Sequence, residues 1–212
     1  FANLRKVLLY LLSDAFSEIT LVLGSLFVGL PLPVTASQIL WINLANDGLP
    51  SLALTVDPKD EGLLKQKPKK MDESIMDTEI KTLIALISGS AGILVLLGFA
   101  WILRQGASIE LARTFAFTTL SVTTLLYVFS SRSLKTPIWR DKWWVNPWLI
   151  LAVLAGFGMQ LLAVYHPIFQ RLLETQPLGW SEWRIILIIV VVIIGLIEIT
   201  KELFLHQKKV IR

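Results

Sequence analysis

The chain has no cysteine among its 212 residues, and only 17% of its residues are charged. Without cysteine it can form neither disulfides nor thiolate metal sites, and its redox compartment stays open. A soluble domain of this size would carry about 25% charged residues. Because 54% of the residues are hydrophobic and the mean hydropathy is +0.65, the shortage of charge indicates a polytopic membrane protein.

A signal peptide and an internal repeat are also missing. The chain begins at Phe1, without Met, at what reads as the middle of a helix. We therefore expect a fragment of a longer protein. Gradient-driven carriers often contain internal repeats, so the lack of one weighs against that class.

Six apolar segments have the length needed to span a membrane as helices, about 20 residues each. They cover residues 7–30, 36–56, 83–103, 112–131, 146–165 and 184–204. The sequence thus predicts an all-α membrane protein with six transmembrane helices, in which residues 1–212 form a single membrane domain surrounded by lipid.

The basic residues divide unevenly between the two sides that these spans define. Sixteen of the 20 Lys and Arg fall on the side that holds both chain ends, and the other side has only Arg104, Arg113, Arg171 and Arg184. By the positive-inside rule the richer side is cytoplasmic. We expect an integral multi-pass protein with both termini in the cytoplasm. Topology and lipid headgroups explain these charges, and nothing supports nucleic-acid binding.

The most informative segment is Asn-Leu-Ala-Asn-Asp-Gly-Leu-Pro at residues 43–50, inside the second apolar segment. An ionisable side chain at membrane depth is costly and indicates a functional site. Gly48 adds backbone freedom and Pro50 lacks a backbone donor. The second helix is therefore predicted to be unwound near its middle, between about Asn46 and Leu49. Carbonyls freed at such a break commonly face an ion.

Two carboxylates and two carboxamides are expected around this break. Glu18 and Asp47 are each central in their spans, so neighbouring antiparallel helices bring them to a similar depth. Asn43, Asn46 and Asp47 are spaced i, i+3, i+4 and share a helix face. Their oxygens and that of Glu18 predict an all-oxygen site for a hard cation such as Ca2+, Na+, K+ or Mg2+. The alternative is a hydrogen-bond network that only joins the two helices.

Other polar residues at membrane depth are interpreted as structural. Asp14 shares a helix face with Glu18 but is expected near water at the cytoplasmic entrance. Glu198 precedes Lys201, which favours an ion pair. The hydroxyls of residues 118–124 can bond back to their own helix. The small residues at 88–92 favour close helix packing.

These motifs resemble a known family, the P-type ATPases, and specifically the last six membrane helices (five to ten) of the calcium-pump-like type II cation pumps. Residues 43–50, followed by Ala53-Leu54 and Asp57-Pro58, are similar to the sixth helix of calcium pumps. Residues 3–18 are similar to the fifth helix, and residues 144–149 to the start of the ninth. The resemblance covers essentially the whole chain.

The resemblance implies roles for individual positions. Glu18 matches an ion-binding glutamate of the fifth helix, and Asp47 matches the sixth-helix aspartate that ion sites share. Asn43 matches an asparagine ligand, and Asn46 a threonine ligand position. The metal ligands implied for this chain are thus Glu18, Asn43, Asn46 and Asp47, with Ca2+ as the expected cation.

Some parts of the family pattern are missing. Ala15 stands where two-site calcium pumps have an asparagine ligand, and Thr123 lies near the position of an eighth-helix glutamate. One Ca2+ per cycle, or another ion, is therefore implied. The Asp-Lys-Thr-Gly-Thr phosphorylation motif is absent, as are the domains that bind ATP and Mg2+. The expected partners are the pump's N-terminal membrane helices and cytoplasmic domains, and this region is not expected to be catalytic alone.

Three alternatives stay open at this stage. An H+ or Na+/K+ pump of the same family is one, a six-helix gradient-driven carrier is another, and a non-catalytic membrane fragment is the third. A phosphorylation motif in frame upstream of Phe1 would indicate the pump, whereas an initiator Met close by would favour the other two classes.

Overall fold

The computed structural model describes residues 2–58, 76, 78–133 and 137–210, and within these ranges every regular element is helical. The predicted all-α fold is confirmed. In chain order the elements are α1 (Ala2–Phe27), α2 (Ala36–Trp41), the π-helix η1 (Ile42–Asp47), α3 (Gly48–Thr55), α4 (Thr78–Arg104), α5 (Ile109–Arg132), the short 3-10 helices η3 (Ile138–Arg140) and η4 (Trp143–Val145), α6 (Pro147–Tyr165), α7 (Pro167–Leu173) and α8 (Trp180–Val210).

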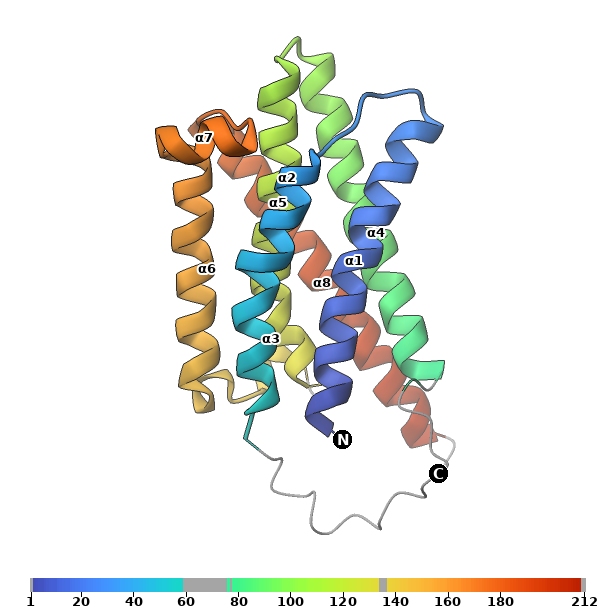
Figure 1. The fold of residues 1–212 in the computed structure, drawn as a ribbon. Coiled ribbons are helices and arrows are strands. Elements are labelled where there is room, and N and C mark those ends of the chain that lie inside the picture. Colours follow the sequence, from blue (N-terminus) through green and yellow to red (C-terminus); the bar gives the residue numbers. More distant parts are fainter. Residues whose placement is uncertain (1, 59–75, 77, 134–136, 211–212) are drawn as a thin grey trace.

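Five of these helices, α1, α4, α5, α6 and α8, are long and apolar enough to cross a membrane. The sixth predicted span consists of α2, η1 and α3, which follow one another without a gap from residue 36 to residue 55. Figure 1 shows these three pieces in line, running alongside the long helices.

The helix ends differ from the predicted spans. Helices α4 and α8 extend beyond residues 83–103 and 184–204, and α1 covers residues 2–27 rather than 7–30. Apolar length marks only the part of a helix suited to hydrocarbon, so it misses polar turns that stay helical. Helix α1 stops before Gly29, which has a positive φ of 72° that favours glycine. The short helix α7 was not predicted.

Helix α5 forms the centre of the bundle. In its candidate span 89% of the residues are buried, against 28–50% in the other four. It packs against α4, α6 and α8, while α1 packs mainly against α4. Helix α5 also packs against α1 and η1, so it borders the region between them.

Helices α1 and α4 approach each other closely at Gly92. A Cβ atom there would lie 2.6 Å from Cβ of Thr20 and 2.9 Å from the carbonyl oxygen of Ser17, whereas a Cβ at Gly89 would meet nothing within 4 Å. The predicted close packing at residues 88–92 is therefore confirmed at Gly92, which contacts the residues on either side of Glu18 in α1.

A buried ionic cluster ties four helices together where α1 begins. Asp57, just past α3, accepts hydrogen bonds from Lys6 Nζ of α1 at 2.6 Å and from Arg132 Nε of α5 at 2.7 Å. The same carboxylate accepts from Asn146 Nδ2, which precedes α6, at 2.9 Å. Because α8 ends at this end of the bundle too (Figure 1), the cluster and both ends of the described chain lie together.

The predicted ion pair on α8 is confirmed. Lys201 Nζ donates to Glu198 Oε1 at 2.8 Å, and the second oxygen of Glu198 accepts from the backbone N–H of Ile138 at 2.9 Å. Both charged residues are almost fully buried. Glu198 therefore fixes the chain after α5 onto α8 and is not available as an ion ligand.

Candidate cation site

The second span is interrupted near its middle, as predicted, but the form of the interruption differs. Residues 42–47 form the π-helix η1, and the chain from Gly48 onward is α-helical rather than unwound. The cause lies in Pro50, which cannot donate to the carbonyl of Asn46 one turn earlier. Tyr10 of α1 donates its hydroxyl to that carbonyl at 3.0 Å instead. The freed carbonyl thus accepts from α1, and the backbone widens without leaving a helical path.

The last two residues of η1 hold buried polar atoms without partners. Asn46 is fully buried, and neither its Oδ1 nor its Nδ2 has a hydrogen-bond partner among the described residues. Asp47 is 4% exposed and its Oδ1 likewise has none. Asp47 also precedes α3 without capping it. Buried polar groups are normally satisfied, so these atoms are available to a ligand.

Glu18 of α1 is buried beside Asn43. Its Oε1 has no hydrogen-bond partner within the described ranges, and its carboxylate interacts with the Asn43 side chain. Asn43 itself is exposed at the edge of the bundle and donates from Nδ2 to the carbonyl oxygen of Ile39 at 2.9 Å. The structure therefore brings Glu18, Asn46 and Asp47 into the interior, with Asn43 at their outer edge.

Asp14 was interpreted as lying near water, and this is wrong. It is 3% exposed, because α5 covers the side of α1 on which it stands. The hydroxyl of Thr124 on α5 donates to Asp14 Oδ1, and the Asp14 and Asp47 carboxyl groups are close enough to interact electrostatically. The sequence feature that could have indicated its burial is its spacing: Asp14 lies four residues before Glu18 and therefore shares a helix face with it.

These side chains gather in one region but do not close around a single point. Within the described parts of the chain, no group of three or more His, Asp or Glu side chains is placed so that it could hold a metal ion. A cation bound here would have to draw on amide and carbonyl oxygens as well as carboxylates. Alternatively, the helices must shift to bring the carboxylates together.

Two of the five hydroxyls in residues 118–124 bond back to their own helix, so the prediction for this segment is confirmed only in part; Thr118 accepts from Gln160 Nε2, and Ser121 Oγ has no partner among the described residues. Thr119 donates to the carbonyl oxygen of Phe115, and Thr123 to that of Thr119, each at 2.7 Å. Thr124 is different because it donates to a carboxylate on another helix. Thr123 is therefore a helix-packing residue, whereas Thr124 belongs to the polar region around Asp14.

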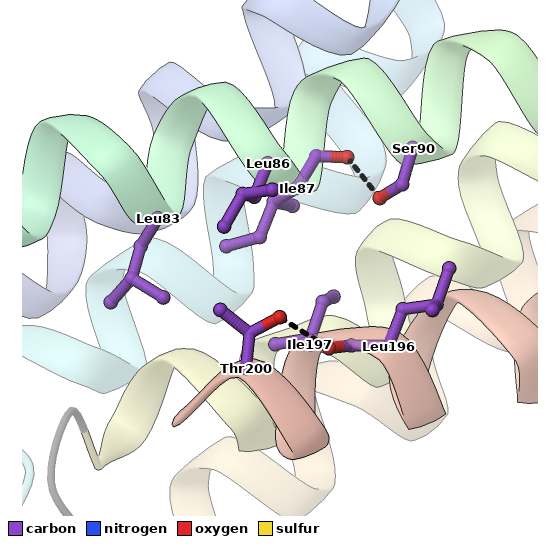
Figure 2. Close-up of a pocket in the computed structure, with 7 residues that line it drawn as sticks. All are labelled: Leu83, Leu86, Ile87, Ser90, Leu196, Ile197 and Thr200. Carbon is purple, nitrogen blue, oxygen red and sulfur yellow. Dashed lines mark hydrogen bonds between the residues drawn. The ribbon is translucent and has the colours of Figure 1, made fainter. Parts of the chain in front are cut away.

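A separate small cavity lies between α4 and α8 (Figure 2). Its two hydroxyl groups, those of Ser90 and Thr200, donate to carbonyl oxygens of their own helices at 3.1 and 2.8 Å. The other lining side chains are aliphatic: Leu83, Leu86, Ile87, Leu196 and Ile197. Without a free oxygen ligand this cavity is not a cation site.

Comparisons with known proteins identify similar sequences. A family described as "Cation transporting ATPase, C-terminus" matches residues 31–203. A "Calcium-transporting ATPase" of Bacillus subtilis is 31% identical over 188 residues, which are 88% of this chain and 21% of that protein. A "Probable cation-transporting ATPase F" of Mycobacterium bovis is 33% identical over 187 residues, 86% of this chain and 20% of the relative.

A third relative matches a larger share of the chain. The "Calcium-transporting ATPase 1" of Bacillus cereus is 29% identical over an alignment 217 residues long, gaps included, and the alignment covers 95% of this chain and 24% of that protein. The chain thus spans between 20% and 24% of the length of these three relatives.

Proposed function

Because the chain belongs to the C-terminal membrane region of the cation-transporting P-type ATPases, we propose that it carries Ca2+ across the membrane within an intact, ATP-driven pump. Two of the relatives described above are named calcium-transporting ATPases. The proposed site lies between α1 and η1 and uses oxygens of Glu18, Asn43, Asn46 and Asp47.

The observation that supports this site is the set of buried oxygens without partners. Glu18 Oε1, Asp47 Oδ1 and Asn46 Oδ1 have no hydrogen-bond partner among the described residues, and a carboxylate left so in a protein interior is costly. Ca2+ binds six to eight oxygens from carboxylates, amides and carbonyls. A bound Ca2+ would supply the interaction that these atoms lack.

The proposed cycle begins at the cytoplasmic end. The ion exchanges its water for the oxygens of the site, and phosphorylation elsewhere in the pump moves the helices so that the site opens on the other side. A proton or another counter-ion then neutralises the carboxylates. ATP and Mg2+ bind to domains outside this chain. The buried Asp57 cluster is consistent with such a movement, because hydrogen bonds to Asp57 join α1, α5 and the residue before α6 to the end of α3.

The outer face of α1 and α2–α3 is proposed to contact the pump's N-terminal membrane helices. Leu40, Leu44 and Leu52 are 65–70% exposed there, and Phe16 of α1 is 46% exposed. The exposed Asn43 lies on this face. Neighbouring helices would cover it and could add the ligands that a closed site needs. The remaining apolar surface would contact lipid.

The proposed orientation has both termini in the cytoplasm. It can be tested with single cysteines at positions 78 and 28. Thr78 begins α4 and Val28 follows the end of α1, so the two positions lie at opposite ends of the bundle (Figure 1). An impermeant thiol reagent should label the first only from the cytoplasmic side and the second only from outside. Labelling in the reverse pattern, or of both from one side, would contradict the orientation.

The choice of ion is tested by ATP hydrolysis of the intact pump with Ca2+, Mn2+, Na+ or K+ added singly to Mg-ATP. We expect Ca2+ to stimulate hydrolysis and Na+ and K+ to have no effect. Stimulation by Na+ or K+ without Ca2+ would indicate that the pump transports an alkali cation instead. Hydrolysis that responds to none of the four would refute the proposed cation site.

A further inference from the structure

Asp14 is a buried carboxylate that the four proposed ligands do not include. One of its oxygens accepts a hydrogen bond from Thr124 of α5. The other, Oδ2, is buried and has no hydrogen-bond partner among the residues that the structure describes. Only 3% of the residue is exposed, so bulk water does not satisfy this oxygen. A buried carboxylate oxygen without a partner is costly, which makes it a candidate to bind a ligand.

Asp47 is the carboxyl group that interacts with Asp14 from η1. The two carboxyl groups are close enough to interact electrostatically, and Asp47 Oδ1 is also without a partner in the described ranges. Two ionised carboxylates only accept hydrogen bonds. Side by side in a protein interior, they therefore need a proton or a cation between them.

Three of the buried basic side chains are engaged with other carboxylates. Lys6 and Arg132 pair with Asp57, and Lys201 pairs with Glu198. None of these three provides the positive charge between Asp14 and Asp47.

The tyrosines beside Asp14 donate their hydroxyls elsewhere. Tyr10 donates to the carbonyl oxygen of Asn46 at 3.0 Å, and Tyr127 interacts with Ser13 Oγ at 3.4 Å. Their rings stack with centroids 6.0 Å apart and are almost fully buried. The two rings therefore lie beside the carboxyl groups, while Asp14 Oδ2 and Asp47 Oδ1 stay without a hydrogen-bond partner among the described residues.

We propose that Asp14 is a further ligand of the transported cation, that it pairs with Asp47, and that Thr124 is the positioning residue that holds it. The cation region then extends from Glu18 and η1 to the side of α1 that faces α5. This inference rests on the proposed function.

The alternative is a structural tie between α1 and α5. An amide at position 14 keeps the side-chain shape and one acceptor for the Thr124 hydroxyl, so Asp14→Asn preserves such a tie and removes only the charge. A ligand role and a structural role therefore predict different results for this variant.

The test uses the intact pump and measures Ca2+ activation of ATP hydrolysis together with equilibrium binding of radioactive Ca2+. Asp14→Asn should weaken both by about tenfold or more, since even changes to outer-shell partners cost 10- to 100-fold in metal affinity. Asp14→Glu, which restores a carboxylate, should recover part of the loss. Thr124→Val should weaken binding by a smaller factor. The double variant Asp14→Asn/Thr124→Val should bind Ca2+ no more weakly than Asp14→Asn alone, because Thr124 acts through Asp14.

The matched control is Ser17→Ala, one turn along α1. Ser17 is also buried, but its hydroxyl only donates to the carbonyl oxygen of Ser13 at 2.7 Å, so Ca2+ affinity should stay within about twofold. Unchanged affinity in Asp14→Asn, with an unfolding temperature like the wild type, would overturn the inference. If Asp14→Asn does not fold, unchanged affinity in both Asp14→Glu and Thr124→Val would overturn it.

The two proposals fail in different ways. If the wild-type pump does not respond to Ca2+, the proposed function fails and Asp14 loses its role with it. If the wild type responds and Asp47→Asn does not, while Asp14→Asn behaves as the wild type, only the role of Asp14 is refuted.

Discussion

Replacement of Asp57 by alanine should destabilise the bundle more than any exposed charge change. The Asp57 side chain is 1% exposed, and the side chains of its partners Lys6 and Arg132 are 10% and 8% exposed. Alanine removes the carboxylate that both cations share, and it also removes an acceptor for Asn146. Arg132 keeps a weaker contact with Asp141 at 3.3 Å, but Lys6 is left buried without its anion.

The expected loss follows from the cost of a buried, uncompensated charge. Removing one partner of a buried pair costs about 3–5 kcal/mol. In a chain of this length each kcal/mol shifts the unfolding temperature by roughly 2–4 °C. Asp57→Ala should therefore lower the midpoint by about 10 °C, measured by circular dichroism during heating of the chain in detergent micelles.

The matched control is Glu202→Ala, which breaks an exposed ion pair. Glu202 and Arg140 are 3.7 Å apart, with side chains 45% and 69% exposed, and such pairs contribute about 0–1 kcal/mol. The control should shift the midpoint by no more than about 2 °C. If Asp57→Ala shifted it as little as the control does, the cluster would not stabilise the bundle and the reasoning would be refuted.

Three further predictions concern the close helix contact, the π-helix and the site. Gly92→Ala should reduce the free energy of unfolding by about 1–3 kcal/mol through overpacking against α1 and so lower the unfolding midpoint. Gly89→Ala, whose Cβ meets nothing within 4 Å, should be neutral or slightly stabilising, and equal effects of the two changes would refute the close contact. Tyr10→Phe leaves the Asn46 carbonyl without its donor and should reduce the free energy of unfolding by about 1–3 kcal/mol in the same assay. An unchanged midpoint would mean that this carbonyl has another donor. Glu18→Gln should severely weaken Ca2+-driven hydrolysis in the intact pump, whereas Thr123→Ala, whose hydroxyl bonds within its own helix, should have little effect; the opposite order would place the site on α5.

The spans could be predicted from sequence because membrane crossing depends on a local property. Apolar length near 20 residues identified five uninterrupted helices and the interrupted one at residues 36–55. The interruption was also visible locally, since Gly48 and Pro50 act on the backbone of their own helix.

The form of the interruption could not be predicted, because it depends on a residue from another helix. Tyr10 lies 36 positions before Asn46 in the chain, and its hydroxyl satisfies the carbonyl that Pro50 leaves free. The same limit explains Asp14. Counting positions along α1 gives its depth, but its burial depends on α5, more than 100 residues away.

The Asp57 cluster illustrates the third kind of limit. Its members, at positions 6, 57, 132 and 146, fall in four segments of the sequence. The positive-inside rule assigned Lys6 and Arg132 to one side of the membrane and treated them as surface charges. Only the packed bundle brings them onto one carboxylate, where they form buried structure.

The central claim is that the transported cation binds at η1, and equilibrium binding of radioactive Ca2+ to the intact pump without ATP tests it most directly. We predict that the wild type binds Ca2+ and that Asp47→Asn, which keeps the shape of the side chain and removes its charge, does not bind at concentrations that saturate the wild type. Unchanged binding by Asp47→Asn would contradict the account.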